Sequence, residues 1–116
     1  MILSASARTI EVTTETFAAV FARPLVLLSW ISRSYTSWRA FATVYEQAAQ
    51  RHPDVAFGLV DIDQQRHLAA AFVIREIPTV TAFHRYRLVS IRAGFQIDES
   101  LDALVRTLEH SAGGSR

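Results

Sequence analysis

Two apolar segments constrain the fold of this chain more than any other feature. Residues 25–30 read LVLLSW, and residues 55–63 read VAFGLVDID. A strand that is apolar at successive positions is covered on both of its faces, as the central strands of a parallel sheet are. The apolar residues between the two segments have the three- and four-residue spacing of one helix face: Trp38, Phe41, Tyr45 and Ala49. The pattern therefore predicts two parallel central strands joined by a helix.

Shorter signals continue this alternation on either side. Residues 8–12 predict a short strand, and Thr13 or Thr14 is expected to cap a helix that Pro24 ends. Residues 65–72 predict a second short helix, between the strand at residues 55–63 and the next strand. Each strand in this part of the chain is thus followed by a helix.

The C-terminal part predicts a hairpin and a final helix. Residues 79–94 alternate around a tight turn near Arg85 and Tyr86, which is typical of two antiparallel strands. The last helix is indicated by apolar residues at helical spacing, with Asp98 in position to cap it: Leu101, Leu104, Val105 and Leu108. The complete order predicts an α/β fold, in which a mixed central sheet of four to five strands has helices on both faces.

The composition suits one domain and excludes several activities. The chain has 116 residues, half of them apolar, so we expect one domain over residues 1–110 and a disordered tail over residues 111–116. The 12 basic residues are all arginines spread along the chain, and the net charge is +1, which argues against nucleic acid as the main partner. There is no cysteine, so disulfides, thiol chemistry and zinc–thiolate sites are excluded. We see no signal peptide and no apolar segment of spanning length, and therefore expect a cytoplasmic protein without a membrane span.

In the segment after the first apolar strand, Trp30 is followed by Ser34-Tyr35-Thr36-Ser37 at the start of the predicted long helix. This segment resembles the active-site region of the thioredoxin family, in which a tryptophan is followed by Cys-Gly-Pro-Cys where the long helix opens. The resemblance covers nearly the whole chain, from about Arg8 to Glu109.

Two further motifs carry the same resemblance. Residues 60–64, VDIDQ, are similar to a strand end and turn of the thioredoxin family. Residues 75–79, REIPT, are similar to the family's Ile-Pro-Thr, which has a cis proline opposite the active site. Gly94 falls where the family keeps a glycine beside its substrate groove. The resemblance implies the thioredoxin fold, with a cis peptide bond before Pro78.

At several positions the sequence lacks the residues that the thioredoxin family uses for thiol–disulfide exchange. The positions that match the redox cysteines are Ser34 and Ser37, and a serine hydroxyl neither ionises near neutral pH nor forms a disulfide. The family's buried aspartate and its lysine partner, which help to move a proton, match Leu28 and Leu59. A buried acid without a role is costly, so leucine is expected where no proton has to move. We therefore expect no catalytic residue, no cofactor and no metal in the chain as written.

Simpler roles for the serines remain open. Ser34 is well placed to cap the long helix by accepting the backbone N–H of Thr36 or Ser37. A serine hydrolase needs a histidine and an acid beside its nucleophile, and no motif places one of the four histidines there: His52, His67, His84 and His110. The histidines and acids also lack the spacing of metal ligands.

The resemblance implies a groove for polypeptide around the vacated site. Its expected lining is Trp30, Arg33, Tyr35, Trp38, Ile77, Pro78 and Gly94. Tryptophan, tyrosine and arginine dominate binding hot spots, and the family holds peptide backbone through the residue before the cis proline, here Ile77. The leading hypothesis is a redox-inactive thioredoxin-like protein that binds a polypeptide or partner protein as a chaperone, adaptor or assembly factor. The plain alternative for Trp30 and Trp38 is packing beneath the first turn of the helix.

Two other functions remain open. The natural protein is a disulfide oxidoreductase if its cysteines were replaced by serine at positions 34 and 37. A contact with nucleic acid would use four basic residues of the hairpin together with Tyr86: His84, Arg85, Arg87 and Arg92. The same side chains also suit a solvated sheet edge that resists strand addition. The residues do not indicate an oligomeric state.

Overall fold

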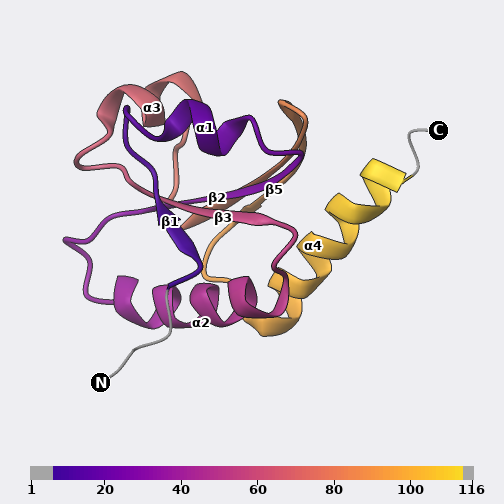
Figure 1. The fold of residues 1–116 in the computed structure, drawn as a ribbon. Coiled ribbons are helices and arrows are strands. Elements are labelled where there is room, and N and C mark those ends of the chain that lie inside the picture. Colours follow the sequence, from indigo (N-terminus) through magenta and orange to yellow (C-terminus); the bar gives the residue numbers. More distant parts are fainter. Residues whose placement is uncertain (1–6, 114–116) are drawn as a thin grey trace.

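The computed structural model describes residues 7–113, in which strands and helices follow one another in the predicted order (Figure 1). The elements are β1 (Thr9–Glu11), α1 (Phe17–Phe21), β2 (Leu25–Ile31), α2 (Trp38–Arg51), β3 (Ala56–Asp61), α3 (Arg66–Ala71), β4 (Thr79–His84), β5 (Arg87–Ala93) and α4 (Asp98–Gly113). Every predicted strand and helix is present, with ends that differ by a few residues.

The strands form one mixed sheet in the order β1-β3-β2-β4-β5. β1, β3 and β2 are parallel, β4 runs antiparallel to β2, and β5 runs antiparallel to β4. Helices α1 and α3 lie on one face of the sheet, and α2 and α4 lie on the other (Figure 1). The parallel part follows from the crossovers, because a helix between two strands returns the chain to the same end of the sheet. The predicted α/β fold is confirmed.

Each face of the sheet has its own apolar cluster. On the α2 and α4 face, Phe41 and Tyr45 of α2 pack with leucines of α4 and with Leu27 and Phe57 of the sheet. On the α1 and α3 face, the cluster combines alternate residues of the same strands with the two short helices: Val26, Leu28, Trp30, Val60, Val20 and Phe83. Successive residues of β2 thus enter opposite clusters, which is why this strand is apolar throughout.

Several predicted helix ends need correction. The residue that precedes α1 is Thr16, later than the predicted Thr13 or Thr14, because the Thr13 hydroxyl instead accepts the backbone N–H groups of Glu15 and Thr16 in a turn before the helix. Asp98 is the first residue of α4 and therefore does not cap it. Helix α4 also continues to Gly113, since Ser111 and Ala112 do not interrupt it, so the expected disorder was wrong for residues 111–113. Residues 114–116 lie outside the described residues.

The hairpin turns without a glycine. Arg85 and Tyr86 have φ angles of 48° and 74°, in the left-handed region that favours glycine or asparagine. Tertiary contacts hold the turn: the Arg85 N–H donates to the Pro24 carbonyl at 3.0 Å, and the Tyr86 ring packs on Phe21 with centroids 5.3 Å apart. The predicted turn near Arg85 and Tyr86 is confirmed.

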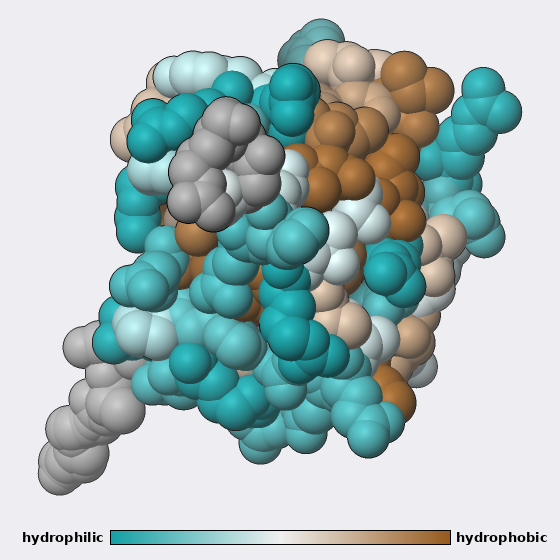
Figure 2. All heavy atoms as spheres, turned by 90° about the vertical axis from the view of Figure 1, so that its right-hand side faces the viewer, coloured by the Kyte–Doolittle hydropathy of each residue, from teal (hydrophilic) through white to brown (hydrophobic). Residues whose placement is uncertain are grey.

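Large apolar and aromatic side chains reach the surface at several places. Within residues 7–113 the exposed ones are Tyr35, Val73, Tyr86, Leu88, Ile91, Phe95 and Ile97. On the face seen in Figure 2, apolar atoms gather in the upper right, whereas the lower part is mostly hydrophilic. No helix in the described part of the chain is both long enough and apolar enough to cross a membrane.

Candidate functional site

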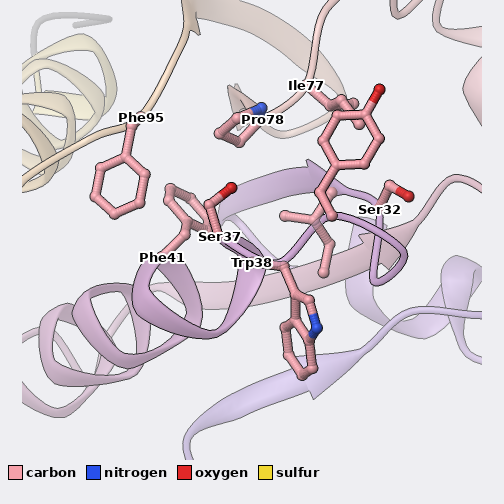
Figure 3. A pocket seen from close by; sticks show the side chains of 9 residues that line it. Ser32, Ser37, Trp38, Phe41, Ile77, Pro78 and Phe95 are labelled. Atoms are coloured by element: carbon pink, nitrogen blue, oxygen red, sulfur yellow. The ribbon is translucent and has the colours of Figure 1, made fainter.

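The candidate site lies where β2 and β3 end, at Ile31 and Asp61, beside the first turn of α2. A shallow pocket opens there, lined mainly by apolar side chains from the β2–α2 loop, α2 and the segment before β4 (Figure 3): Ile31, Ser32, Tyr35, Ser37, Trp38, Phe41, Ile77, Pro78 and Phe95. Its volume is about 20 Å³. Sites for small molecules usually measure roughly 300–1,000 Å³, so the pocket has room for little more than one side chain of a partner.

The segment before β4 forms one wall of the pocket. The Ile77–Pro78 peptide bond is cis, and Pro78 lies opposite Ser37 in the close view (Figure 3). The Gly94 N–H donates to the Pro78 carbonyl at 2.8 Å. Gly94 has a φ of 93°, a conformation that suits glycine alone. This places Gly94 beside the cis proline, where the sequence predicted it.

The backbone of Ile77 is available to a partner. No hydrogen bond of its N–H or its carbonyl occurs within residues 7–113, whereas the neighbouring carbonyls of Glu76 and Pro78 accept from Thr79 and Gly94. A free donor and a free acceptor on one accessible residue are what an added strand requires. Ile77 is partly buried and lines the pocket.

Ser34 does not cap α2, contrary to the predicted role. Its hydroxyl donates to Asp63 Oδ2 at 3.0 Å and lies 2.6 Å from the Ser32 hydroxyl, which also donates to Asp63. These hydrogen bonds from Ser32 and Ser34 lower the pKa of Asp63, so the carboxylate stays charged at neutral pH. Asp63 follows β3, and the turn after that strand brings its charge to the serines.

Ser37 occupies the N-cap position of α2 but makes no side-chain capping bond. Its side chain is exposed and lines the pocket (Figure 3). Within the described residues, no histidine forms a hydrogen bond with Ser34 or Ser37. The only side-chain hydrogen bond of a histidine ring in residues 7–113 joins His52 to Asp102 at 2.7 Å. Neither residue that matches a redox cysteine therefore has the histidine base of a serine hydrolase beside its hydroxyl.

Arg33 is fixed by ion pairs beside the pocket and does not line it. Its guanidinium makes two hydrogen bonds to Glu11, at 2.7 and 3.0 Å, and approaches Asp61 at 3.5 Å. The hydrogen bond with Glu11 is the main reason that the pKa of Arg33 is raised. The guanidinium also lies 5.0 Å from the centre of the Trp38 ring, and that of Arg39 lies 5.5 Å away. The Trp38 ring points away from Pro78 (Figure 3). Trp38 therefore lines the pocket mainly with the part of the residue nearest the backbone and less with its ring.

Trp30 is not a groove residue. It is fully buried, and its indole N–H donates to Thr81 Oγ1 at 3.0 Å on the α1 and α3 face of the sheet. The alternative role, packing beneath the first turn of the long helix, was also wrong for Trp30, because residue parity along β2 directs its side chain to the face of the sheet opposite α2 and Ile31. Leu28 and Leu59 are also buried, but they enter different clusters and lie on opposite faces of the sheet.

Sequence reasoning missed Phe95. This residue is 46% exposed, lines the pocket, and makes an edge-to-face contact with Phe41 at 5.5 Å between ring centres. Phe95 directly follows Gly94, so its proximity to the expected groove glycine was a usable signal. With Tyr35, which is 57% exposed, it gives the site two accessible aromatic rings.

The described residues offer no metal centre at the site or elsewhere, since residues 7–113 contain no group of three or more histidine, cysteine, aspartate or glutamate side chains able to hold an ion. Asp61 and Asp63, which follow one another closely at the end of β3, are used by Arg33 and by the serines. What remains open at the site is apolar and aromatic surface beside free backbone groups. Such an arrangement suits binding of a polypeptide more than a reaction.

Fold and site together define an α/β protein in which a cis proline faces the first turn of the helix after a central strand. The thioredoxin family profile matches residues 8–109, so the chain belongs to the thioredoxin family. "Putative thioredoxin 2" of Streptomyces coelicolor is 40% identical over 73 residues, which span 62% of this chain and 54% of that protein. A thioredoxin of Mycoplasmoides gallisepticum is 30% identical over 76 residues, which span 62% of this chain and 76% of that protein.

Solved structures show the same architecture. A mutant thioredoxin from Halobacterium salinarum superimposes with a TM-score of 0.79 at 22% identity, over 90% of this chain and 96% of that one. Thioredoxin f from spinach chloroplast gives a TM-score of 0.76 at 25% identity, over 86% of each chain. The predicted thioredoxin fold is confirmed, and the chain spans about half the length of the Streptomyces relative.

Proposed function

We propose that this chain is a redox-inactive member of the thioredoxin family that binds an extended segment of a partner protein at the pocket beside Pro78. The observation that carries the proposal is the combination of an absent thiol with a retained binding surface. The chain has no cysteine, yet the exposed rings of Tyr35 and Phe95 and the free backbone of Ile77 surround the pocket. Roles as a chaperone, an adaptor or an assembly factor all use such a surface.

The pocket supports a particular mode of binding. The partner's backbone would pair with the N–H and carbonyl of Ile77, as in strand addition, and one apolar side chain would enter between Tyr35, Phe41 and Pro78. Backbone pairing supplies affinity with little sequence preference, whereas the small apolar pocket selects one side chain. Aromatic residues near the centre of an interface often contribute about 2 kcal/mol or more each, on the scale of alanine substitution.

A thioredoxin whose cysteines were replaced by serine is the alternative, and the names of the two relatives favour it. The residue at position 28 opposes it. Leu28, at the position of the family's buried aspartate, is fully buried and packed in the cluster on the α1 and α3 face. A replacement confined to the two cysteines does not account for leucine at position 28, although some active members of the family also lack the acid. The natural coding sequence at positions 34 and 37 decides between the two.

Affinity capture from native lysate, followed by binding of the captured partner to purified chain, tests the proposal. Tyr35→Ala/Phe95→Ala is expected to weaken binding at least tenfold, on the order of 1.4 kcal/mol, because both rings are exposed at the pocket. Tyr86→Ala is the matched control, since Tyr86 is 62% exposed but lies on the hairpin turn outside the pocket. An equal loss of partner affinity in Tyr35→Ala/Phe95→Ala and in Tyr86→Ala would show that the pocket is not the binding site. Unchanged affinity in Tyr35→Ala/Phe95→Ala would show the same.

A further inference from the structure

A second and larger pocket lies at the other end of the sheet. It has a volume of about 240 Å³ and is lined by Ala7, Arg8, Ile10, Arg23, Ala49, Pro53, Val55 and Ala56. The pocket beside Pro78 measures only about 20 Å³. The volume of the second pocket approaches the lower limit of roughly 300 Å³ for small-molecule sites.

The register of the sheet brings the lining residues together. Thr9 pairs with Phe57, so Arg8 lies next to Ala56 at the start of β3. Val26 pairs with the same Ala56, so β2 also begins at this end of the sheet. The segment that leads into β2 contains Arg23. In Figure 1 the α2–β3 connection is at the right end of the sheet, and the β2–α2 loop of the candidate site is at the left end. Strands of six or seven residues separate the two ends by roughly 20 Å.

The charges of this second pocket are positive and unpaired. Neither the Arg8 nor the Arg23 guanidinium makes an ion pair within residues 7–113. The Glu46 carboxylate is occupied by the backbone N–H groups of Arg8 and Thr9 and by the Gln50 side chain. Asp54, beside Pro53 in the chain, forms an ion pair with neither arginine. The two guanidinium groups therefore both remain available to an anion that enters the pocket.

We propose that this pocket binds a phosphate group, either as the free ion or as a phosphate monoester of a small molecule. A phosphate dianion matches two guanidinium groups in charge, and its oxygens accept the paired N–H groups of arginine in fork geometry. The other lining residues have small or apolar side chains: Ala7, Ile10, Ala49, Pro53, Val55 and Ala56. The surface that they and the arginines expose in the pocket is nevertheless mostly polar, which suits the phosphate group itself. The site is separate from the peptide pocket and does not depend on the function proposed there.

Backbone amide NMR of the full chain tests the site with inorganic phosphate and with adenosine monophosphate, at constant ionic strength maintained with chloride. We expect saturable shifts confined to the amides of residues 8–10, 23, 25 and 54–56. Tighter binding of the monoester than of free phosphate would identify a monoester as the ligand, and equal binding would identify the free ion. Shifts reproduced by chloride or matched by succinate, or spread over all the arginines, would overturn the proposal.

Variants make the test specific. Arg8→Gln and Arg23→Gln are each expected to weaken phosphate binding about tenfold, or about 1.4 kcal/mol, whereas Asp54→Asn is expected to strengthen it by removing a negative charge near the pocket. Arg106→Gln is the control, because Arg106 is an exposed residue of α4 outside the pocket. Unchanged affinity in both arginine variants would overturn the proposal, as would an equal effect of Arg106→Gln. Circular dichroism of each variant verifies its folding, and capture of the partner protein is expected to be unaffected.

Discussion

Leu28 fills the space that a side chain at Gly58 would need. The two residues are neighbours across β2 and β3, and a Cβ atom built on Gly58 would lie 2.8 Å from Leu28 Cδ2 and 2.8 Å from Val12 Cγ2. Real Cβ atoms essentially never approach other atoms so closely. At the position that matches the buried aspartate of the thioredoxin family, this chain therefore has a leucine packed over a glycine.

Gly58→Ala is expected to destabilise the chain by about 1–3 kcal/mol, because the added methyl group overpacks the cluster around Leu28. Leu28→Ala in the same background removes one of the two close contacts and leaves that with Val12, so the double variant is expected to be more stable than the sum of the single effects predicts. Urea unfolding of the four proteins measures this coupling. Additive free energies would show that Leu28 and Gly58 do not compete for one space.

Ser34→Cys/Ser37→Cys is expected to create weak disulfide reductase activity in a chain that otherwise has none. Ser37 is the N-cap residue of α2, where the helix dipole lowers a thiol pKa, and Ser34 lies in the loop that leads into the helix. The activity is expected to remain low because Leu28 cannot relay a proton. Insulin reduction with dithiothreitol as electron donor measures it, and the single variant Ser34→Cys is the control. A double variant no faster than the single one would contradict the expectation.

The stability of the chain is expected to fall as the pH drops below about 4.5, partly through Glu46. Burial alone would raise the pKa of Glu46, but hydrogen bonds from the backbone of Arg8 and Thr9 and from the Gln50 and Thr9 side chains outweigh it and lower that pKa below the ordinary 4.5. A folded-state pKa below the unfolded value stabilises the fold above about pH 4.5, and this contribution is lost as the pH falls through the folded-state pKa.

Glu46→Gln isolates that contribution. We expect a loss of about 1 kcal/mol at pH 7, less than for a buried charged hydrogen bond because solvent screens the partly exposed carboxylate. The difference from the original chain should shrink towards pH 3 in urea unfolding. Glu109→Gln, an exposed position of α4, is the control. A difference that stays constant with pH would show that the Glu46 charge has no part in it.

Arg85→Asn is expected to stabilise the hairpin by about 0.5–1 kcal/mol, because asparagine tolerates the left-handed conformation that Arg85 adopts at φ 48°. Tyr86→Gly relieves similar strain but removes the ring contact with Phe21, which is worth roughly 0.5–1.5 kcal/mol. Its net effect is therefore expected to be close to zero. Thermal unfolding compares the two variants, and a larger gain for Tyr86→Gly would indicate that the ring contact contributes little.

The sequence by itself determined the order of elements, because that order depends on local patterns. The continuous apolar run of β2, the helical spacing along α2 and the alternation around Arg85 are all visible in short windows of the chain. The identity of residues 34 and 37 is equally local. Because both are serine and the chain has no cysteine, the sequence alone excludes the family's thiol chemistry.

Only the tertiary structure decided what each side chain of the site contacts. Trp30 and Ile31 are neighbours in sequence, yet the sheet directs one to each face, and only Ile31 reaches the pocket. Ser34 meets Asp63, and Phe95 meets Phe41, across many intervening residues. These pairings depend on strand register and on which helix covers which face. Both are set by the packing of the whole chain, so no short window of sequence contains them.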